Sequence, residues 1–211
     1  MVPARLFLVV ASMGCSAATG RGAAETSPAP AVVARSENSP RVPTRADVEF
    51  MQGMIAHHAQ ALTMAQMVPT HTSNGRIHLL AQRIDVSQKD EIQQMQRWLE
   101  DRHERAPSAD AEHMQHEGMD HSARMPGMLT AEQLGQLENA RGAEFDRLFL
   151  TFMISHHEGA LVMVKTLFGT NGAGQDPQLF GYASEVDADQ RAEIARMRTL
   201  LAAPPNESPP R

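Results

Sequence analysis

A short run in the middle of the chain concentrates side chains that bind soft metal ions. Gly118, Pro126 and Gly127 interrupt any helix there, and no apolar period would bury its methionines. Thioethers favour Cu(I) and Ag(I), while imidazole accepts Cu(II), Cu(I) or zinc. The run therefore predicts an exposed copper site, the alternative being a polar linker without metal. Its candidate ligands are His113, Met114, His116, Met119, His121, Met125 and Met128.

Two histidine pairs form a second group, because His57-His58 and His156-His157 recur at an offset of 99 residues. At about 100° per residue, each pair straddles an apolar helix face. A Gln-x-x-Glu-x-x-x-Met pattern follows each pair and lies on an apolar arc of its own. Imidazole, carboxylate and thioether converging in a bundle core can bind metal. The predicted core ligands are His57, His58, Met54, Glu91, Met95, His156, His157, Met153, Glu193 and Met197.

A structural reading competes with this one. Each histidine could donate to the nearby glutamate or to a backbone carbonyl and so satisfy a polar layer in the core. Methionines at helical spacing commonly fill cores without binding anything. The sequence leaves both readings open for the histidines and favours the filler role for the core methionines taken alone.

These residues lie on a duplicated pair of helices. Residues 47–64 align with 146–163, and residues 81–99 align with 183–201 at an offset of 102. Both blocks keep helical spacing in both copies, which indicates a repeated supersecondary unit. The fold expected is all-α: an antiparallel four-helix bundle built from two repeated helical hairpins.

Local signals set the expected helix ends. Thr44 with Asp47 predicts a capping box, and Pro69 is expected to stop that first helix. The second helix is expected over about 75–102 and the third over 146–168. A short helix should begin at Thr130, with Gly142 separating it from the third. The fourth should begin at Asp176 with proline in its first turn.

Composition excludes several classes of protein. The chain has 211 residues and a net charge of −6, which disfavours binding to nucleic acid. One cysteine excludes an internal disulfide and a cysteine-based zinc site. Aromatic residues make up only 4%, which disfavours β-sandwiches and barrels. Methionine and histidine, at 14 and 10 residues, are unusually frequent.

The N-terminus predicts export. Arg5 precedes an apolar run that is too short to span a bilayer, and Cys15 follows that run. We expect lipidation at Cys15, the alternative being cleavage near Ala17. The domain plan is a signal peptide (1–14), a flexible tether (15–44), a bundle (45–203) and a disordered tail (204–211). Within the bundle lie repeat one (45–103), the His/Met-rich connector (104–129) and repeat two (130–203).

The repeats resemble the family called domain of unknown function 305, whose motif is Asp-x-x-Phe-x-x-x-Met-x-x-His-His-x-x-Ala. The resemblance covers about residues 45–201, including Met125-Pro126-Gly127-Met128 and the phrase beginning at Phe145. It implies a ferritin-like four-helix bundle. For some members it implies extracytoplasmic copper or silver binding and copper tolerance.

The leading hypothesis is a non-enzymatic copper-binding protein of the cell envelope or periplasm. It would sequester Cu(I) or Cu(II), with silver or zinc as alternative ions, or pass these ions on. Its partners would include metal-delivering envelope proteins. Contact with the membrane would be through a lipid anchor only. A ferritin-like metal-dependent redox enzyme is the second hypothesis, disfavoured because only Glu91 and Glu193 are well placed as carboxylate ligands. The third is a metal-free envelope adaptor.

Overall fold

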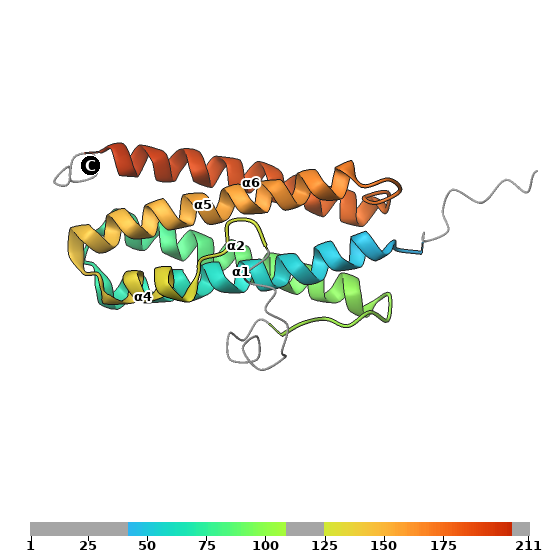
Figure 1. Ribbon diagram of the computed structural model, residues 1–211, viewed down its shortest axis with the longest axis horizontal. Helices are drawn as coiled ribbons and strands as arrows, with labels where there is room; N and C mark the ends of the chain where they lie inside the picture. Colours follow the sequence, from blue (N-terminus) through green and yellow to red (C-terminus); the bar gives the residue numbers. More distant parts are fainter. Residues whose placement is uncertain (1–41, 109–124, 204–211) are drawn as a thin grey trace, which may run out of the picture. The chain divides into compact units, whose positions relative to one another are not determined.

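The computed structural model describes residues 42–108 and 125–203, and all regular structure in them is helical. Four long helices form two hairpins: α1 (Arg45–His71) with α2 (Gly75–Glu100), and α5 (Gly142–Gly169) with α6 (Pro177–Ala202). A short helix, α4 (Ala131–Asn139), precedes the second hairpin. Helix α1 packs against α2 and α5, and α5 packs against α6 (Figure 1). The ferritin-like four-helix bundle of two repeated hairpins is confirmed.

Side-chain caps begin the helices where the sequence predicted. Thr44 and Thr130 each form a capping box, with Asp47 and Gln133 returning the hydrogen bond. Asp176 caps α6 by accepting from the backbone N–H of Leu179, at 2.9 Å. These caps satisfy N–H groups that have no partner within the helix.

Pro69 does not stop α1, so that prediction was wrong. The helix continues to His71, with Pro69 inside its last turn. One local and one tertiary contact hold this turn. One nitrogen of the His71 ring lies 2.7 Å from the carbonyl oxygen of Met67 on the same helix. The other ring nitrogen lies 2.9 Å from the carbonyl oxygen of Glu138. A proline near a helix end removes little of the hydrogen-bond ladder, so such contacts are sufficient.

A polar layer divides the bundle core in two. One apolar cluster contains Phe50, Met54, Met95 and Trp98, and the other contains Met64, Phe145, Met153 and Met197. Between them along the helices lie buried polar side chains from all four long helices. They are His57, His58, Gln60, Gln88, Glu91, His156, His157 and Gln190, joined by the half-buried Glu193.

Residues 125–129, here called the strap, cross over the α1–α5 side of this layer. Gln60 holds the strap by accepting from the N–H of Leu129 at 2.7 Å and donating to its carbonyl at 3.0 Å. Gly159 of α5 has no room for a side chain, because a Cβ there would overlap the backbone of Pro126. Gly127 has a φ of +79°, and a Cβ on it would lie 2.6 Å from the carbonyl oxygen of Ser155. Glycine is therefore required on both sides of the contact.

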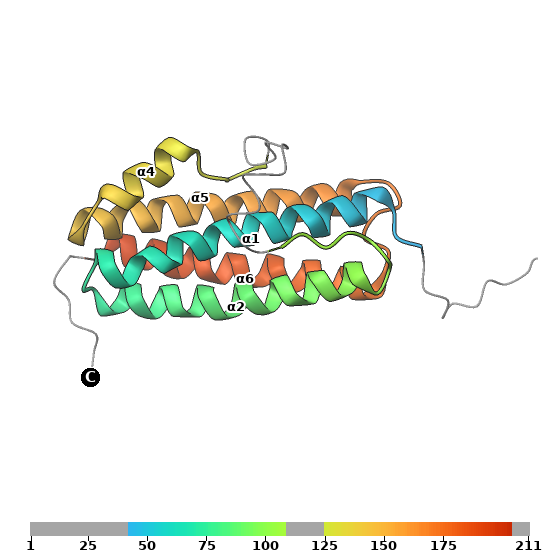
Figure 2. The same cartoon turned by 90° about the horizontal axis from the view of Figure 1, so that it is seen from below.

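Helix α4 continues the cover over the same side and contacts both α1 and α5 (Figure 2). The opposite side is less closely packed, since α2 approaches α6 less closely than α1 approaches α5. Among the helices of the described region, none is both long enough and apolar enough to cross a membrane.

Candidate metal centre

The inner histidines of the two pairs meet at the centre of the bundle. The rings of His57 and His156 have centroids 3.8 Å apart and planes tilted by 38°. Both side chains are fully buried. Nε2 of His57 lies 3.0 Å from the carbonyl oxygen of Pro126, which can only accept a hydrogen bond. The proton of His57 is therefore on Nε2, and its buried, unpartnered Nδ1 carries the lone pair.

Neither ring nitrogen of His156 reaches hydrogen-bond geometry with a partner in the described chain, and the polar group that faces its ring is the backbone of His57. Burial lowers the pKa of His57 to about 3, with the neighbouring His58 adding to the effect. Burial also holds the pKa of His156 well below its usual value, and the charge of a protonated His57 would lower it further. Both imidazoles are consequently neutral at physiological pH, the form that binds metal.

The outer histidines of the pairs face the carboxylates on the neighbouring helices. Nε2 of His58 donates to Glu91 at 2.5 Å, and Nε2 of His157 donates to Glu193 at 2.6 Å. These two bonds are related by the internal repeat, and in each the Nδ1 atom is buried without a partner. A carboxylate that accepts from imidazole fixes the tautomer of the ring and makes the other nitrogen more basic. This arrangement serves a polar core and also prepares a ligand.

The core methionines are buried on either side of the histidine layer. Met54 and Met95 lie in one apolar cluster, and Met153 and Met197 lie in the other. Packing explains these four thioethers without a metal. Within residues 42–108 and 125–203, no group of three or more His, Cys, Asp or Glu side chains is arranged to hold a metal ion. A ligand set would thus draw on paired imidazoles and thioethers, and its residues stay a prediction.

Only part of the connector lies within the described residues. Met125 and Met128 belong to the strap, whereas His113, Met114, His116, Met119, His121 and the lipidation candidate Cys15 lie outside the described residues. The side chains of Met125 and Met163 both lie beside Gly53. Their nearest atoms lie 3.6 Å and 3.4 Å from where a Cβ on Gly53 would stand. Sequence reasoning missed Met163, although it aligns with Met64 in the repeat.

The outer side of the layer is acidic. Burial raises the pKa of Asp189, and the carboxylates of Glu91, Glu193 and Glu185 raise it further. These four acids come from α2 and α6 and face the more open side of the bundle. The sequence singled out Glu91 and Glu193 but missed Asp189, since nothing local distinguishes it from other surface acids.

The internal repeat and the histidine layer define a class of helical bundle with paired core histidines. The family model for the domain of unknown function DUF305 matches residues 47–201, and the chain belongs to that family. The described fold and the matched range agree, since the match begins near the start of α1 and ends at the last turn of α6.

Solved structures of this family have the same fold. A DUF305 fragment from Deinococcus radiodurans is 28% identical, with a TM-score of 0.63 over 76% of this chain and 98% of that chain. A DUF305 protein from Streptomyces coelicolor, provisionally assigned as secreted, is 30% identical. Its TM-score is 0.60, over 74% of this chain and 92% of that chain.

CopM in its Cu(II)-bound form is 26% identical, with a TM-score of 0.57 over 74% of this chain and 95% of that chain. CopM has also been solved in Cu(I)-bound and silver-bound forms. A shorter match links the chain to the uncharacterized protein L153 of Acanthamoeba polyphaga mimivirus. It is 39% identical over 56 residues, which span 26% of this chain and 37% of that protein.

Proposed function

We propose that this protein binds copper outside the cytoplasm, and that it sequesters the ion or passes it on. The observation that carries the proposal is the His57–His156 pair, two fully buried neutral imidazoles in contact, with unpartnered ring nitrogens. Leaving buried polar atoms without partners costs about 1–3 kcal/mol each. A bound ion would offset that cost, because a metal accepts the lone pair that Nδ1 of His57 offers.

The likeness to CopM supports copper as the cargo, since CopM binds Cu(I), Cu(II) and silver in its solved forms. The donors of this chain fit such ions. Neutral imidazole suits both copper oxidation states, and thioethers suit Cu(I) and Ag(I). His57 and His156 would hold the ion, and the strap carbonyl of Pro126 would fix the His57 ring with Nδ1 available. The connector residues His113, Met114, His116, Met119 and His121 would add exposed donors.

The same proposal covers location. The apolar N-terminal run followed by Cys15 supports export and lipid anchoring, and the Streptomyces relative with its provisional secreted assignment agrees with export. Changing Cys15 to Ser should move the protein from the membrane fraction to the soluble exported fraction. Unchanged fractionation would remove the anchor and leave the copper proposal standing.

An anaerobic Cu(I) titration against a chromophoric competitor tests the copper sites. The double variant His57→Gln/His156→Gln should lose at least one Cu(I) ion from the stoichiometry of the parent. A matched control, His71→Gln/His78→Gln, removes two histidines outside the layer and should bind as the parent does. Equal stoichiometry in all three proteins would refute the core site. A variant with Ser at all seven connector positions then decides whether the connector binds the copper instead.

A further inference from the structure

Two phenylalanines at the tip of the second hairpin are exposed and lie in contact. Among the phenylalanines of the described region, only Phe168 of α5 and Phe180 of α6 are exposed, at 41% and 55%. Their ring centroids lie 5.3 Å apart, with the planes tilted by 49°. Single apolar side chains are common on protein surfaces, whereas a contiguous apolar patch indicates a contact with a partner.

The fold holds the Phe168 ring in this exposed position. A Cβ on Gly174, in the loop between α5 and α6, would lie 2.9 Å from the ring, and the φ of Gly174 is +67°. Ala173 and Asp176 of the same loop are buried. The N–H of Gly174 donates to Asp47 of α1 at 2.7 Å. The ring therefore packs on a loop that is fixed to α1, and its exposure is a property of the fold.

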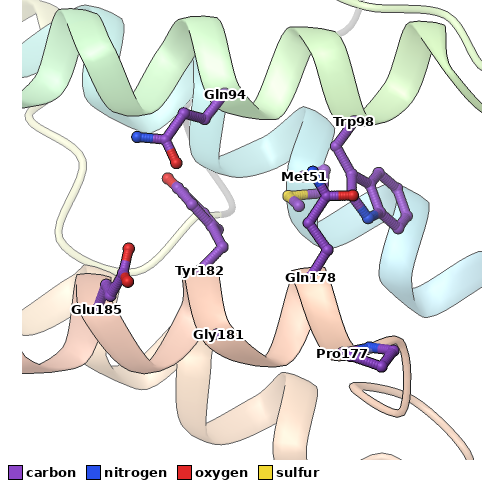
Figure 3. Close-up of a pocket in the computed structure, with 8 residues that line it drawn as sticks. All are labelled: Met51, Gln94, Trp98, Pro177, Gln178, Gly181, Tyr182 and Glu185. Atoms are coloured by element: carbon purple, nitrogen blue, oxygen red, sulfur yellow. The ribbon is translucent and has the colours of Figure 1, made fainter.

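The aromatic pair does not belong to the interior of the bundle. On another side of the same turns of α6, Gly181 and Tyr182 line a cavity of about 230 Å³ between α2 and α6 (Figure 3). Neither Phe168 nor Phe180 lines that cavity. The two rings thus offer their surface to a partner outside the chain.

The surface that α5 and α6 contribute around the pair carries no exposed acid. Between Glu158 and Glu185 the only acid is Asp176, which is buried and paired with an arginine. Lys165 is exposed and lies one turn before Phe168 on the same side of α5. This part of the surface is positive in a chain whose net charge is −6. Apolar side chains beside a positive charge complement a bilayer with anionic headgroups.

The chain enters the bundle at this same end. Val42 is the first described residue and α1 follows it directly. The bond from Gly174 to Asp47 places the start of α1 beside the loop that follows α5, and both lie at one end of the bundle (Figure 1). An N-terminal lipid anchor at Cys15 would therefore bring this end to the membrane first.

We propose that the Phe168–Phe180 pair inserts into the headgroup region of the membrane and docks the bundle by this end, with Lys165 beside anionic lipids. Two weak attachments together hold a protein stably where one alone is readily reversed. The docking rests on the proposed export, since an exported protein meets this surface. It does not depend on copper, so metal-free protein is used to test it.

Binding of the full chain to vesicles of phosphatidylglycerol and phosphatidylcholine tests the docking. All proteins carry Cys15→Ser, so lipidation plays no part and the N-terminal run is the same in each. Phe168→Ser/Phe180→Ser should weaken binding about tenfold, because two partly exposed phenyl groups lose their burial in lipid. The control Leu79→Ser/Val86→Ser removes apolar side chains of α2 that are 58% and 70% exposed, and should bind as the parent does. Thermal midpoints check that each variant is folded.

The charge contribution has its own variant. Lys165→Gln should weaken binding to these vesicles about fivefold, the effect of one cation near an anionic surface. On vesicles of phosphatidylcholine alone, the same variant should bind as the parent does.

A polarity-sensitive fluorophore identifies the end that touches lipid, whatever attaches the protein. In the Cys15→Ser chain it is placed on Thr170→Cys at the hairpin tip, or on Thr199→Cys near the opposite end of α6. The two threonines are matched, because both are exposed and each hydroxyl donates to the carbonyl four residues earlier. Vesicles should shift the emission to shorter wavelength at position 170 only.

Equal vesicle binding by the double phenylalanine variant and the parent would overturn the docking. So would vesicle-bound protein whose label at position 170 stays in water. A shift at position 170 that occurs without vesicles and grows with protein concentration would assign the pair to self-association instead. Export is judged separately by fractionation, and copper binding by its titration.

Discussion

The two sides of the bundle treat the same repeated motif differently. On the α1–α5 side, the inner histidines His57 and His156 lie in contact beneath the strap and are neutral. On the α2–α6 side, the outer histidines His58 and His157 donate to carboxylates whose side chains are 11% and 15% exposed. One side is fully buried and tightly packed. The other is acidic and contains a cavity.

This difference separates two kinds of binding chemistry in one small fold. The buried pair of neutral imidazoles suits a soft ion that is held by donor atoms. A seam of carboxylates suits a cation that is held by charge and stays partly in water. Adjacent residues on one helix supply both groups, because neighbouring side chains on a helix point about 100° apart.

The largest effect on the free energy of unfolding should come from adding one methyl group under the strap. Gly159→Ala would place a Cβ against the backbone of Pro126, and overpacking of this kind costs about 1–3 kcal/mol. Gly135→Ala in α4 meets nothing within 4 Å and should instead stabilise by about 0.5–1 kcal/mol. Urea unfolding of both variants measures the contrast. Stabilisation by both would mean that the strap does not pack on α5.

Acid should have the next largest effect, through the buried histidines of the α1–α5 side. His57 takes up a proton near pH 6.5 when unfolded and only at about pH 3 when folded. The unfolded state therefore binds more protons between these values, so stability falls as the pH drops through that window. From pH 7 to 5, protonation of His57 in the unfolded state alone should lower the free energy of unfolding by about 2 kcal/mol. His156 should lower it further.

Urea unfolding at both pH values, compared with His57→Gln/His156→Gln, isolates this contribution from that of the carboxylates. The double variant should show a shallower pH dependence than the parent. Equal slopes of stability against pH in the two proteins would mean that the inner histidines take up protons in the folded protein as readily as in the unfolded one. That result would contradict their neutral state.

The smallest of the three effects should come from the open side. Asp176 caps α6 and also accepts from Trp98 and, at 2.8 Å, from Arg102, so it joins α2 to α6 at one end. Asp176→Ala should cost about 1–2 kcal/mol, the range for a lost cap. Asp187→Ala, which breaks an exposed pair with Arg191, should cost less than about 0.5 kcal/mol. Equal thermal midpoints for the two variants would remove Asp176 as the link between the helices.

Most of the fold could be predicted because its signals are local and repeated. Helical spacing, the caps at Thr44, Thr130 and Asp176, and the constant offset between copies each depend on a few neighbouring residues. Pro69 was misjudged because the contacts that hold its turn come from Met67 nearby and from Glu138 far away in sequence.

The site was predictable only in part. Its histidines and their glutamate partners followed from their angular positions around the helices and from the internal repeat. The contact between His57 and His156 depends on how α1 docks on α5, and the bond to Pro126 joins residues 69 positions apart. No local pattern encodes either. The cavity beside Tyr182 results from the separation of α2 and α6, a property of the assembled bundle.

The strap contact also bears on why the two hairpins share one polypeptide. Gln60 and Gly159 occupy equivalent positions in the two copies. The amide of Gln60 hydrogen-bonds to the strap, whereas Gly159 leaves room for the strap because it has no side chain. In a homodimer of identical hairpins both positions would carry the same residue, so either the grip or the clearance would be lost. Fusion of the duplicated halves therefore allowed each to specialise. It predicts that two copies of a single hairpin, expressed without the other hairpin, cannot pair to rebuild the strap contact.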